Sequence, residues 1–176
     1  SDGSVVVQGH STIDSWQDQI PPLQPGESYV GIDAHWDFSA ARVGPTRTYV
    51  SFASGCSGSR PTSRLVPSDT PSIGATHKVR LFDLPHDAAF FVFGWNRTGP
   101  VSLASQGMPG CMQHVSIDAV AFVGGQNGQA VHELPIPEWS GLIGLSFFNQ
   151  AVVLDANANA LGAVVSDAAE GVIGRR

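Results

Sequence analysis

The sequence is poor in charge, and above all in positive charge. Asp, Glu, Lys and Arg make up 14% of its 176 residues, against about 25% in an average soluble chain. Lysine occurs once, at Lys78, and the formal net charge is −6 at pH 7. A nucleic-acid or anionic-membrane partner requires a basic patch, which this composition does not favour. We therefore expect no nucleic-acid partner.

Long apolar runs and the residues of surface helices are also scarce. No stretch approaches the roughly 18 consecutive apolar residues of a membrane-spanning helix, so we expect no membrane insertion. The 20 glycines and 12 prolines amount to 32 of 176 residues, about 18%, against about 12% in an average chain. This composition disfavours a helical bundle, a coiled coil and a disordered tail.

The first residues lack the basic and apolar segments of a secretory signal peptide. Residues 1–4 are polar, so the protein is expected either to be cytosolic or to have lost its signal peptide already. Few lysines, many small polar residues and two cysteines favour the second alternative, a secreted or cell-surface protein.

The common catalytic and cofactor-binding motifs are missing. The chain has neither C-x-x-C nor C-x-x-C-H, neither H-E-x-x-H nor G-x-S-x-G, and no phosphate-binding glycine loop. A glycosidase whose two carboxylates lie far apart in sequence is still compatible with the chain. We expect a non-catalytic protein without a cofactor or a tightly bound metal ion.

Residues 1–28 are predicted to form an N-terminal arm. The segment is polar, is interrupted by prolines at 21, 22 and 25, and has one β-branched run, Val5-Val6-Val7. A short strand of this kind can add to the sheet edge of a neighbouring molecule. We therefore predict that the arm acts between molecules and that these valines contact a partner.

Residues 29–54 are predicted to form a β-hairpin that packs on the main domain. Apolar and polar side chains alternate from Tyr29 to Phe38, which predicts a half-buried strand. A turn is expected at Gly44–Thr46, and Thr48–Ala53 is expected to return as the second strand of the pair.

Residues 55–176 are predicted to form an antiparallel β-sandwich, Ig-like or jelly-roll-like. Turn signals recur about every 8–12 residues, as in all-β domains, and no long amphipathic helix is apparent. Asn127-Gly128 is a strong hairpin turn, and Pro135 and Pro137 place the end of their strand at a sheet edge. An Ala-rich segment, 156–169, is the one place where a short helix competes. The expected strands are 77–83, 88–95, 111–117, 119–123, 129–134, 143–154, 161–166 and 170–174.

Several landmarks in this region resemble one known kind of domain. They are Gly55–Ser59, Gly107–Cys111, Leu134–Pro137, Phe148–Asp155, Ala158–Gly162 and Gly171–Gly174. From Gly55 onward the chain resembles a C-terminal β-sandwich domain that recurs in large secreted proteins of planctomycetes and some deltaproteobacteria. The resemblance covers about two thirds of the chain and leaves out residues 1–54. It implies an exported bacterial protein with an Ig-like sandwich, and it brings no assigned activity and no catalytic residues.

The two cysteines, Cys56 and Cys111, both lie in Gly-rich turns. In an exported protein such a pair is expected to form a disulfide. Closing a loop of about 55 residues contributes roughly 4 kcal/mol to stability in the chain-entropy model. The alternative is two free, buried thiols.

Asp33, His35 and Asp37 share one face of the first predicted strand. Alternate strand positions lie about 7 Å apart, so this row could hold a divalent metal ion with ligands from elsewhere. The simpler interpretation is a solvated polar face.

Residues 155–159 begin like a calcium-binding EF-hand loop. Ala160 and Ser166 replace its glycine and its bidentate glutamate, so the pattern is incomplete. An Asx turn, in which the side chains cap the backbone, is the simpler interpretation.

Three functions are compatible with these observations. We favour a non-catalytic structural or adhesive protein of the cell exterior, with a protein partner or self-assembly, in which Trp16 and Trp139 join the arm in partner contact. A carbohydrate-binding module is the alternative, and it requires Trp16, Trp139 or Trp95 lined up on one open face. A metal-assisted hydrolase built on the Asp33 row is the third. Each tryptophan could instead pack under a loop.

Overall fold

The computed structural model describes residues 27–35 and 38–175, and between 27 and 45 it describes the course of the backbone. Strands account for 54% of the structure and helix for 5%, which confirms the all-β fold class. Two single-turn 3-10 helices, η2 (Ala104–Gln106) and η3 (Ser140–Leu142), are far too short to span a membrane, and the described residues contain no longer helix that could. The strands are β1 (Glu27–His35), β2 (Phe38–Pro45), β3 (Thr48–Ala53), β4 (Arg64–Pro67), β5 (Thr76–Phe82), β6 (Ala88–Gly94), β7 (Arg97–Ser102), β8 (Met112–Val115), β9 (Ala119–Gln126), β10 (Gln129–Pro135), β11 (Ser146–Leu154) and β12 (Ala163–Val172).

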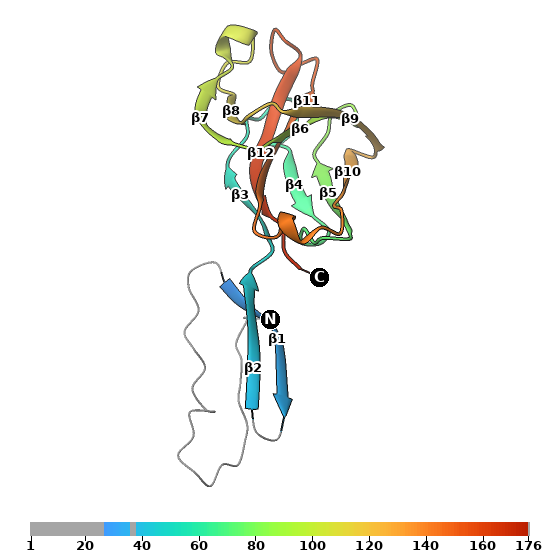
Figure 1. The fold of residues 1–176 in the computed structure, drawn as a ribbon. Helices are drawn as coiled ribbons and strands as arrows, with labels where there is room; N and C mark the ends of the chain where they lie inside the picture. Colours follow the sequence, from blue (N-terminus) through green and yellow to red (C-terminus); the bar gives the residue numbers. More distant parts are fainter. Residues whose placement is uncertain (1–26, 36–37, 176) are drawn as a thin grey trace.

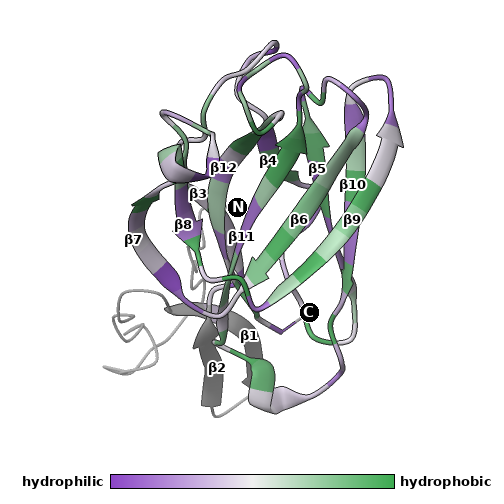
Figure 2. Ribbon diagram, turned by 90° about the horizontal axis from the view of Figure 1, so that it is seen from above, coloured by the Kyte–Doolittle hydropathy of each residue, from purple (hydrophilic) through white to green (hydrophobic). Residues whose placement is uncertain are grey.

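Eight of these strands form one antiparallel sheet that curls into a nearly closed barrel (Figures 1 and 2). Their order is β3-β12-β11-β6-β9-β10-β5-β4. The sheet closes because β4 returns to β12: the N–H of Leu65 donates to the Asp167 carboxylate at 2.8 Å, and the N–H of Asp167 donates to the Ser63 carbonyl at 3.1 Å. The β7–β8 and β1–β2 pairs form two further small sheets.

Alternate side chains of the barrel strands form the core. On β5, His77, Val79 and Leu81 are buried while Thr76, Lys78 and Arg80 are exposed, which is the period of two expected for a strand with one inner face. The outer face of β6 is covered in part, because Val92 packs with Val115 of β8 in a second, smaller cluster. The barrel therefore has an apolar interior and one apolar outer contact with the β7–β8 hairpin.

The strand pairing predicted for residues 29–54 is wrong. β1 pairs with β2, with Glu27 opposite Pro45, whereas β3 pairs with β12. In the sequence, the apolar alternation continues through residues 36–37, which carry no Gly, Pro or Asn turn signal. The pattern therefore offered no reason to expect a reversal between the two strands.

Two predictions in the C-terminal part also need correction. Residues 161–166 and 170–174, expected as separate strands, belong largely to the single ten-residue strand β12. The Ala-rich segment forms turns followed by this strand, in which Ala168 and Ala169 are fully buried. Strands β4 and β7 were not predicted, since both are short and lie in polar, Pro-containing sequence.

The predicted Cys56–Cys111 disulfide is confirmed, with Cα atoms 5.1 Å apart. It ties the segment before β4 to the segment before β8. The N–H of Cys56 also donates to the Val165 carbonyl of β12 at 3.1 Å. An intramolecular disulfide of this kind is typical of extracellular proteins.

Two of the landmark segments, Gly55–Ser59 and Phe148–Asp155, meet through a hydrogen bond close in sequence to Cys56. Asp155 is fully buried, and its carboxylate accepts hydrogen bonds from the N–H groups of Ser59, at 2.6 Å, and Asn157, at 3.3 Å. The Asn159 side chain accepts from the N–H of Gly162 at 3.0 Å. Burial alone would raise the pKa of Asp155, but the hydrogen bonds from Ser59 and Asn157 outweigh the effect of burial, and the pKa is lowered. The Asx-turn interpretation therefore holds.

Candidate functional site

The barrel wall is split between β9 and β10. The two strands pair only at Gln129 with Gln126 and at Ala130 with Gly125, next to the tight turn. By contrast, β9 pairs with β6, and β10 with β5, over six positions each. Beyond the turn the split opens into an apolar slot of about 570 Å³ that reaches into the barrel. A cavity of this size lies in the range of small-molecule and peptide sites.

The backbone of β10 presents hydrogen-bonding groups to the split. The N–H of Ile136 donates to the Ala75 carbonyl at 2.9 Å, and the N–H of Gly74 donates to the Ile136 carbonyl at 3.0 Å. The backbone N–H and C=O groups of Ile136 therefore point towards the β5 side. Backbone groups of successive strand residues point to alternate sides. Those of Val131 and Glu133 therefore point towards β9, where the ladder has already ended.

The backbone of β9 also presents hydrogen-bonding groups to the split, from the opposite side. The N–H of Gly125 donates to the Asp87 carbonyl at 2.7 Å, on the β6 side. By the same alternation, Val120 and Phe122 direct their backbone groups towards β10. The split therefore has two facing strand edges inside the sheet.

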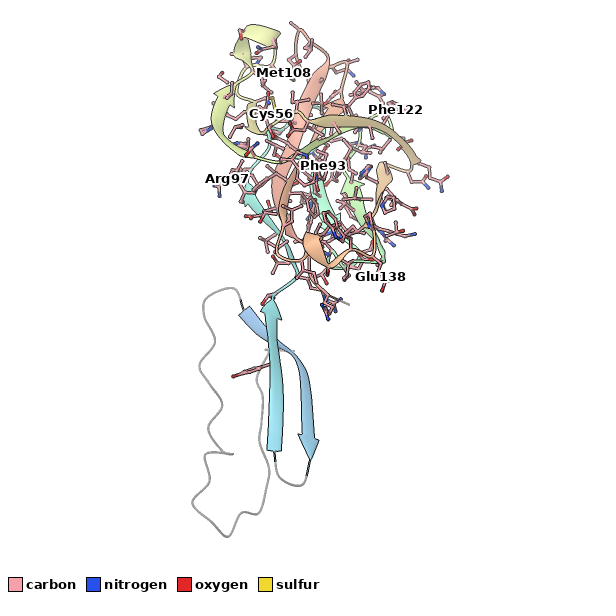
Figure 3. All side chains as sticks on the ribbon, viewed as in Figure 1. Cys56, Phe93, Arg97, Met108, Phe122 and Glu138 are labelled. Carbon is pink, nitrogen blue, oxygen red and sulfur yellow. A yellow bond between two sulfur atoms is a disulfide. The ribbon has the colours of Figure 1, made fainter. Side chains whose placement is uncertain are left out.

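Stacked rings form the floor of the slot. Phe93 and Phe147 stack with centroids 5.5 Å apart and planes inclined by 14°, and Phe91 and His132 stack at 4.0 Å and 15°. Phe147 is fully buried, whereas Phe93, labelled in Figure 3, is only partly buried although its ring stacks on Phe147 inside the barrel. The exposure of an inward-facing ring shows that the wall in front of it is incomplete.

Small side chains keep this wall open. Ala119 and Ala121 of β9 line the slot where larger residues would fill it, and Pro135 ends β10 on the opposite side. Proline has no N–H to donate to a neighbouring strand. The edge that Pro135 and Pro137 predicted in the sequence is the edge at this split.

Two exposed tryptophans stand at the rim. Trp139, 64% exposed, is held by Gly141, where a Cβ would lie 2.8 Å from the indole ring. Trp95, 50% exposed, donates its backbone N–H to the Asp118 carboxylate at 2.8 Å. The hydroxyl of Ser116 and this N–H lower the pKa of Asp118, so the carboxylate stays ionised and holds the loop.

Burial favours the neutral form of the two histidines near the slot. Burial lowers the pKa of His132, and the proximity of His77 lowers it further. Burial also lowers the pKa of His77, although its Nδ1 lies 2.9 Å from the Asp69 carboxylate, which opposes the shift. The floor of the slot therefore carries no charge and suits an apolar group.

A smaller polar hollow of about 420 Å³ lies beside the slot. Glu138, Ser140 and Arg175 line it together with Ile73 and Gly74, and Trp139, between Glu138 and Ser140 in the chain, lines the slot. These side chains could donate and accept hydrogen bonds next to an aromatic ring.

The structure brings some of the predicted residues to this region and leaves others apart. Trp139 and Trp95 share the rim, as a binding face requires. Trp16, Asp37 and Val5, Val6 and Val7 lie outside the described residues. Asp33 and His35 lie on β1, and within the described part of the chain no three His, Cys, Asp or Glu residues come together as a metal site.

Little in the sequence indicates the slot itself. Ala121 and His132 were predicted only as strand residues, and their role depends on where β9 and β10 part. The one usable signal was Pro135 at the end of a strand that otherwise has an ordinary alternating pattern.

Comparison of the chain with protein-family models, with curated proteins and with solved structures finds no match. The geometry of the slot must therefore support the functional conclusion by itself.

Proposed function

We propose that this chain is a non-catalytic structural or adhesive domain of the cell exterior, which joins a surface assembly by holding an apolar segment of a protein partner in the slot between β9 and β10. The observation that carries the proposal is the slot: an uncharged aromatic floor between two strand edges. Protein interfaces are centred on such buried aromatic pockets. The disulfide and the low charge support an extracellular location.

Filling the slot tests this function. Ala121→Trp places a large ring where a small side chain now lines the cavity, and Val50→Trp adds the same ring to an exposed position on β3, away from the slot. Sedimentation velocity on the full chain, from micromolar to millimolar concentration, measures self-association. We expect association by the unmodified chain and by Val50→Trp, and at least tenfold weaker association by Ala121→Trp at an unchanged melting temperature.

A chain that stays monomeric throughout this concentration range would contradict self-assembly. Equal association of both tryptophan variants would show that the slot is not the contact.

A carbohydrate-binding module is the second candidate, and the rim favours it. Trp95 and Trp139 both border the slot, and Glu138, Ser140 and Arg175 lie next to Trp139. Sugars stack on exposed aromatic rings while polar side chains bind their hydroxyl groups.

Affinity electrophoresis in gels containing soluble cellulose, chitin or xylan derivatives tests the carbohydrate alternative. Retardation that Trp139→Ala abolishes and Val50→Ala leaves intact would support it. Unretarded migration in all three gels would exclude these polysaccharides and leave the protein partner.

A further inference from the structure

We propose that the segment held in the slot is Val5-Val6-Val7 of a second copy of this chain, added as a β-strand between β9 and β10. This inference rests on the proposed function and specifies its partner. Three observations lead to it: the facing strand edges, the apolar character of both faces of the split, and the place where the arm joins the barrel.

The split offers backbone groups to a strand on both sides. Val120 and Phe122 on β9, and Val131 and Glu133 on β10, point their N–H and C=O groups into it, and the ladder between the strands ends at Ala130. An added strand would pair with both edges and complete the wall. Strand addition at an exposed edge is a common mode of peptide recognition.

Both faces of the split are apolar, which is unusual for a sheet with one side in solvent. On the inside lie Phe93 and Leu134 of the slot. On the outside lie Phe122, 63% exposed, and Val120 and Val131, 53% and 45% exposed. The outer face also has one charged side chain beside Val131, Glu133, which pairs with Lys78 at 2.7 Å. Phe122 also contacts Phe90 edge to face at 5.5 Å. A strand that alternates polar and apolar residues would suit only one of these faces.

The first 26 residues contain one segment that suits both faces. Val5-Val6-Val7 is apolar at three successive positions and contains no proline, whereas the other apolar residues of the arm are isolated or lie beside prolines. In either register at least one valine points inwards and at least one points outwards. β-branched residues also favour the extended conformation that strand addition requires.

The arm begins at the end of the barrel where the slot opens. Glu27 lies opposite Pro45, and Arg47, two residues further on, packs against Gly174, where a Cβ would lie 2.6 Å from that of Arg47. The neighbour of Gly174, Ile173, lines the slot. Figure 1 shows β1 and β2 at this end of the barrel, close to the C-terminus.

The tether is long enough to reach a neighbouring molecule. Residues 8–26, 19 in number, span at most about 63 Å at 3.3 Å per residue. Prolines at 21, 22 and 25 favour an extended course just before β1. We expect this stretch to project the valines away from their own barrel, which favours a second copy over the chain's own slot.

Cysteine trapping between two different chains tests the inference. One chain carries Val5→Cys, Val6→Cys or Val7→Cys, and the other carries Phe122→Cys on the outer face of β9. Because successive valines alternate faces, at least one of the three points to the outer face, where Phe122 lies, in either register. Thr12→Cys serves as the donor control, and Val50→Cys on the exposed edge strand β3 as the acceptor control.

We expect mild oxidation to give a covalent dimer between a valine variant and Phe122→Cys, with at least tenfold higher yield than either control pair. Peptide mapping locates the bond and verifies that Cys56–Cys111 is intact. Preferential trapping at Val50→Cys would move the contact to the β3 edge and overturn the inference while leaving arm-mediated assembly in place. A further variant carries a valine-to-cysteine substitution and Phe122→Cys in the same chain. A bond that forms only within this variant, and not between the two singly substituted chains, would show that the arm fills its own slot, which also overturns the inference.

A charge substitution in the arm gives a second measurement. Val5→Asp with Val6→Asp should weaken self-association at least tenfold, because successive strand residues point to opposite faces and one carboxylate must therefore enter the slot in either register. The matched control, Ser4→Asp with Ser11→Asp, adds the same charge outside the run and should leave association unchanged. Association that persists in the valine variant but fails in Ala121→Trp would refute the arm as occupant and keep the slot as the binding site.

Discussion

Gly171 is the position where a single methyl group should damage the core most clearly. It lies on β12 directly opposite Phe147 of β11. A Cβ at this position would lie 2.6 Å and 2.8 Å from the Cε1 and Cε2 atoms of the Phe147 ring. The ring therefore occupies the space that any other residue at position 171 would need.

Phe147 cannot easily move aside, because other rings surround it. Its centroid lies 5.5 Å from that of Phe93, 6.1 Å from that of His77 and 6.4 Å from that of Tyr49. Forcing an extra methyl group into a packed core costs about 1–3 kcal/mol. We therefore expect Gly171→Ala to lower the free energy of unfolding by about 1–3 kcal/mol. This loss is reduced by the stabilisation that any glycine-to-alanine change gives by restricting the unfolded backbone.

Gly99→Ala isolates that backbone term. Gly99 lies on β7, where an added Cβ would have no atom within 4 Å, and neither glycine has a positive φ. Replacing such a glycine stabilises a protein by about 0.4–1 kcal/mol through the unfolded chain. The difference between the two variants is then the overpacking cost, about 1–3 kcal/mol.

Thermal and urea unfolding of both variants provide the measurement. For a chain of this length each kcal/mol shifts the melting temperature by about 2–4 °C, so a difference of 2 kcal/mol corresponds to about 4–8 °C. If Gly171→Ala and Gly99→Ala unfold within 0.5 kcal/mol of each other, roughly the error of such comparisons, the packing described for Phe147 is wrong.

Three further predictions concern the rest of the barrel. Intact-mass analysis should find two alkylatable thiols only after reduction, and replacing both cysteines by serine should lower stability by about 2–4 kcal/mol; thiols that react without reductant would refute the bond. Burial lowers the pKa values of His77, His114 and His132, so below about pH 6.5 the unfolded chain binds more protons than the folded chain. The urea midpoint should therefore fall as the pH drops from neutral through that value, and it should fall less steeply in His132→Phe. A midpoint that does not change with pH would contradict this. Asp155→Ala should lower the melting temperature clearly more than Asn157→Ala, because it leaves the Ser59 N–H without its acceptor; equal effects would show that the buried carboxylate is not required.

The sequence predicted those parts of the fold that depend on local chemistry. The Asn127-Gly128 turn lies where the pattern places it, with both residues at positive φ, and it joins β9 to β10. The inner faces of β5 and β6 follow the alternation of their apolar residues. The two cysteines, being the only pair, could form only one intramolecular bond.

The rest depends on which strands become neighbours, and periodicity does not specify partners. β3 has an ordinary strand pattern that suits either a hairpin with the preceding strand or an edge position beside β12, and only the tertiary structure selects the second. The slot, too, depends on which strands become neighbours. Its lining residues look like parts of complete strands, and the site exists because β9 and β10 separate after two residue pairs.

The energetics of the proposed contact indicate where such an assembly would form. Burying three valines contributes roughly 5 kcal/mol, and ladder hydrogen bonds add about 0.5–1.5 kcal/mol each. Ordering the five or so residues of an added strand costs about 1–2 kcal/mol per residue, so most of the gain is lost. The remainder of a few kcal/mol corresponds to a Kd closer to millimolar than to micromolar. A contact this weak becomes effective when many copies are held together, because tethering raises the effective concentration of each arm to the millimolar range. The proposed function therefore requires a dense array, such as a cell surface, and dilute solution should contain mostly monomer.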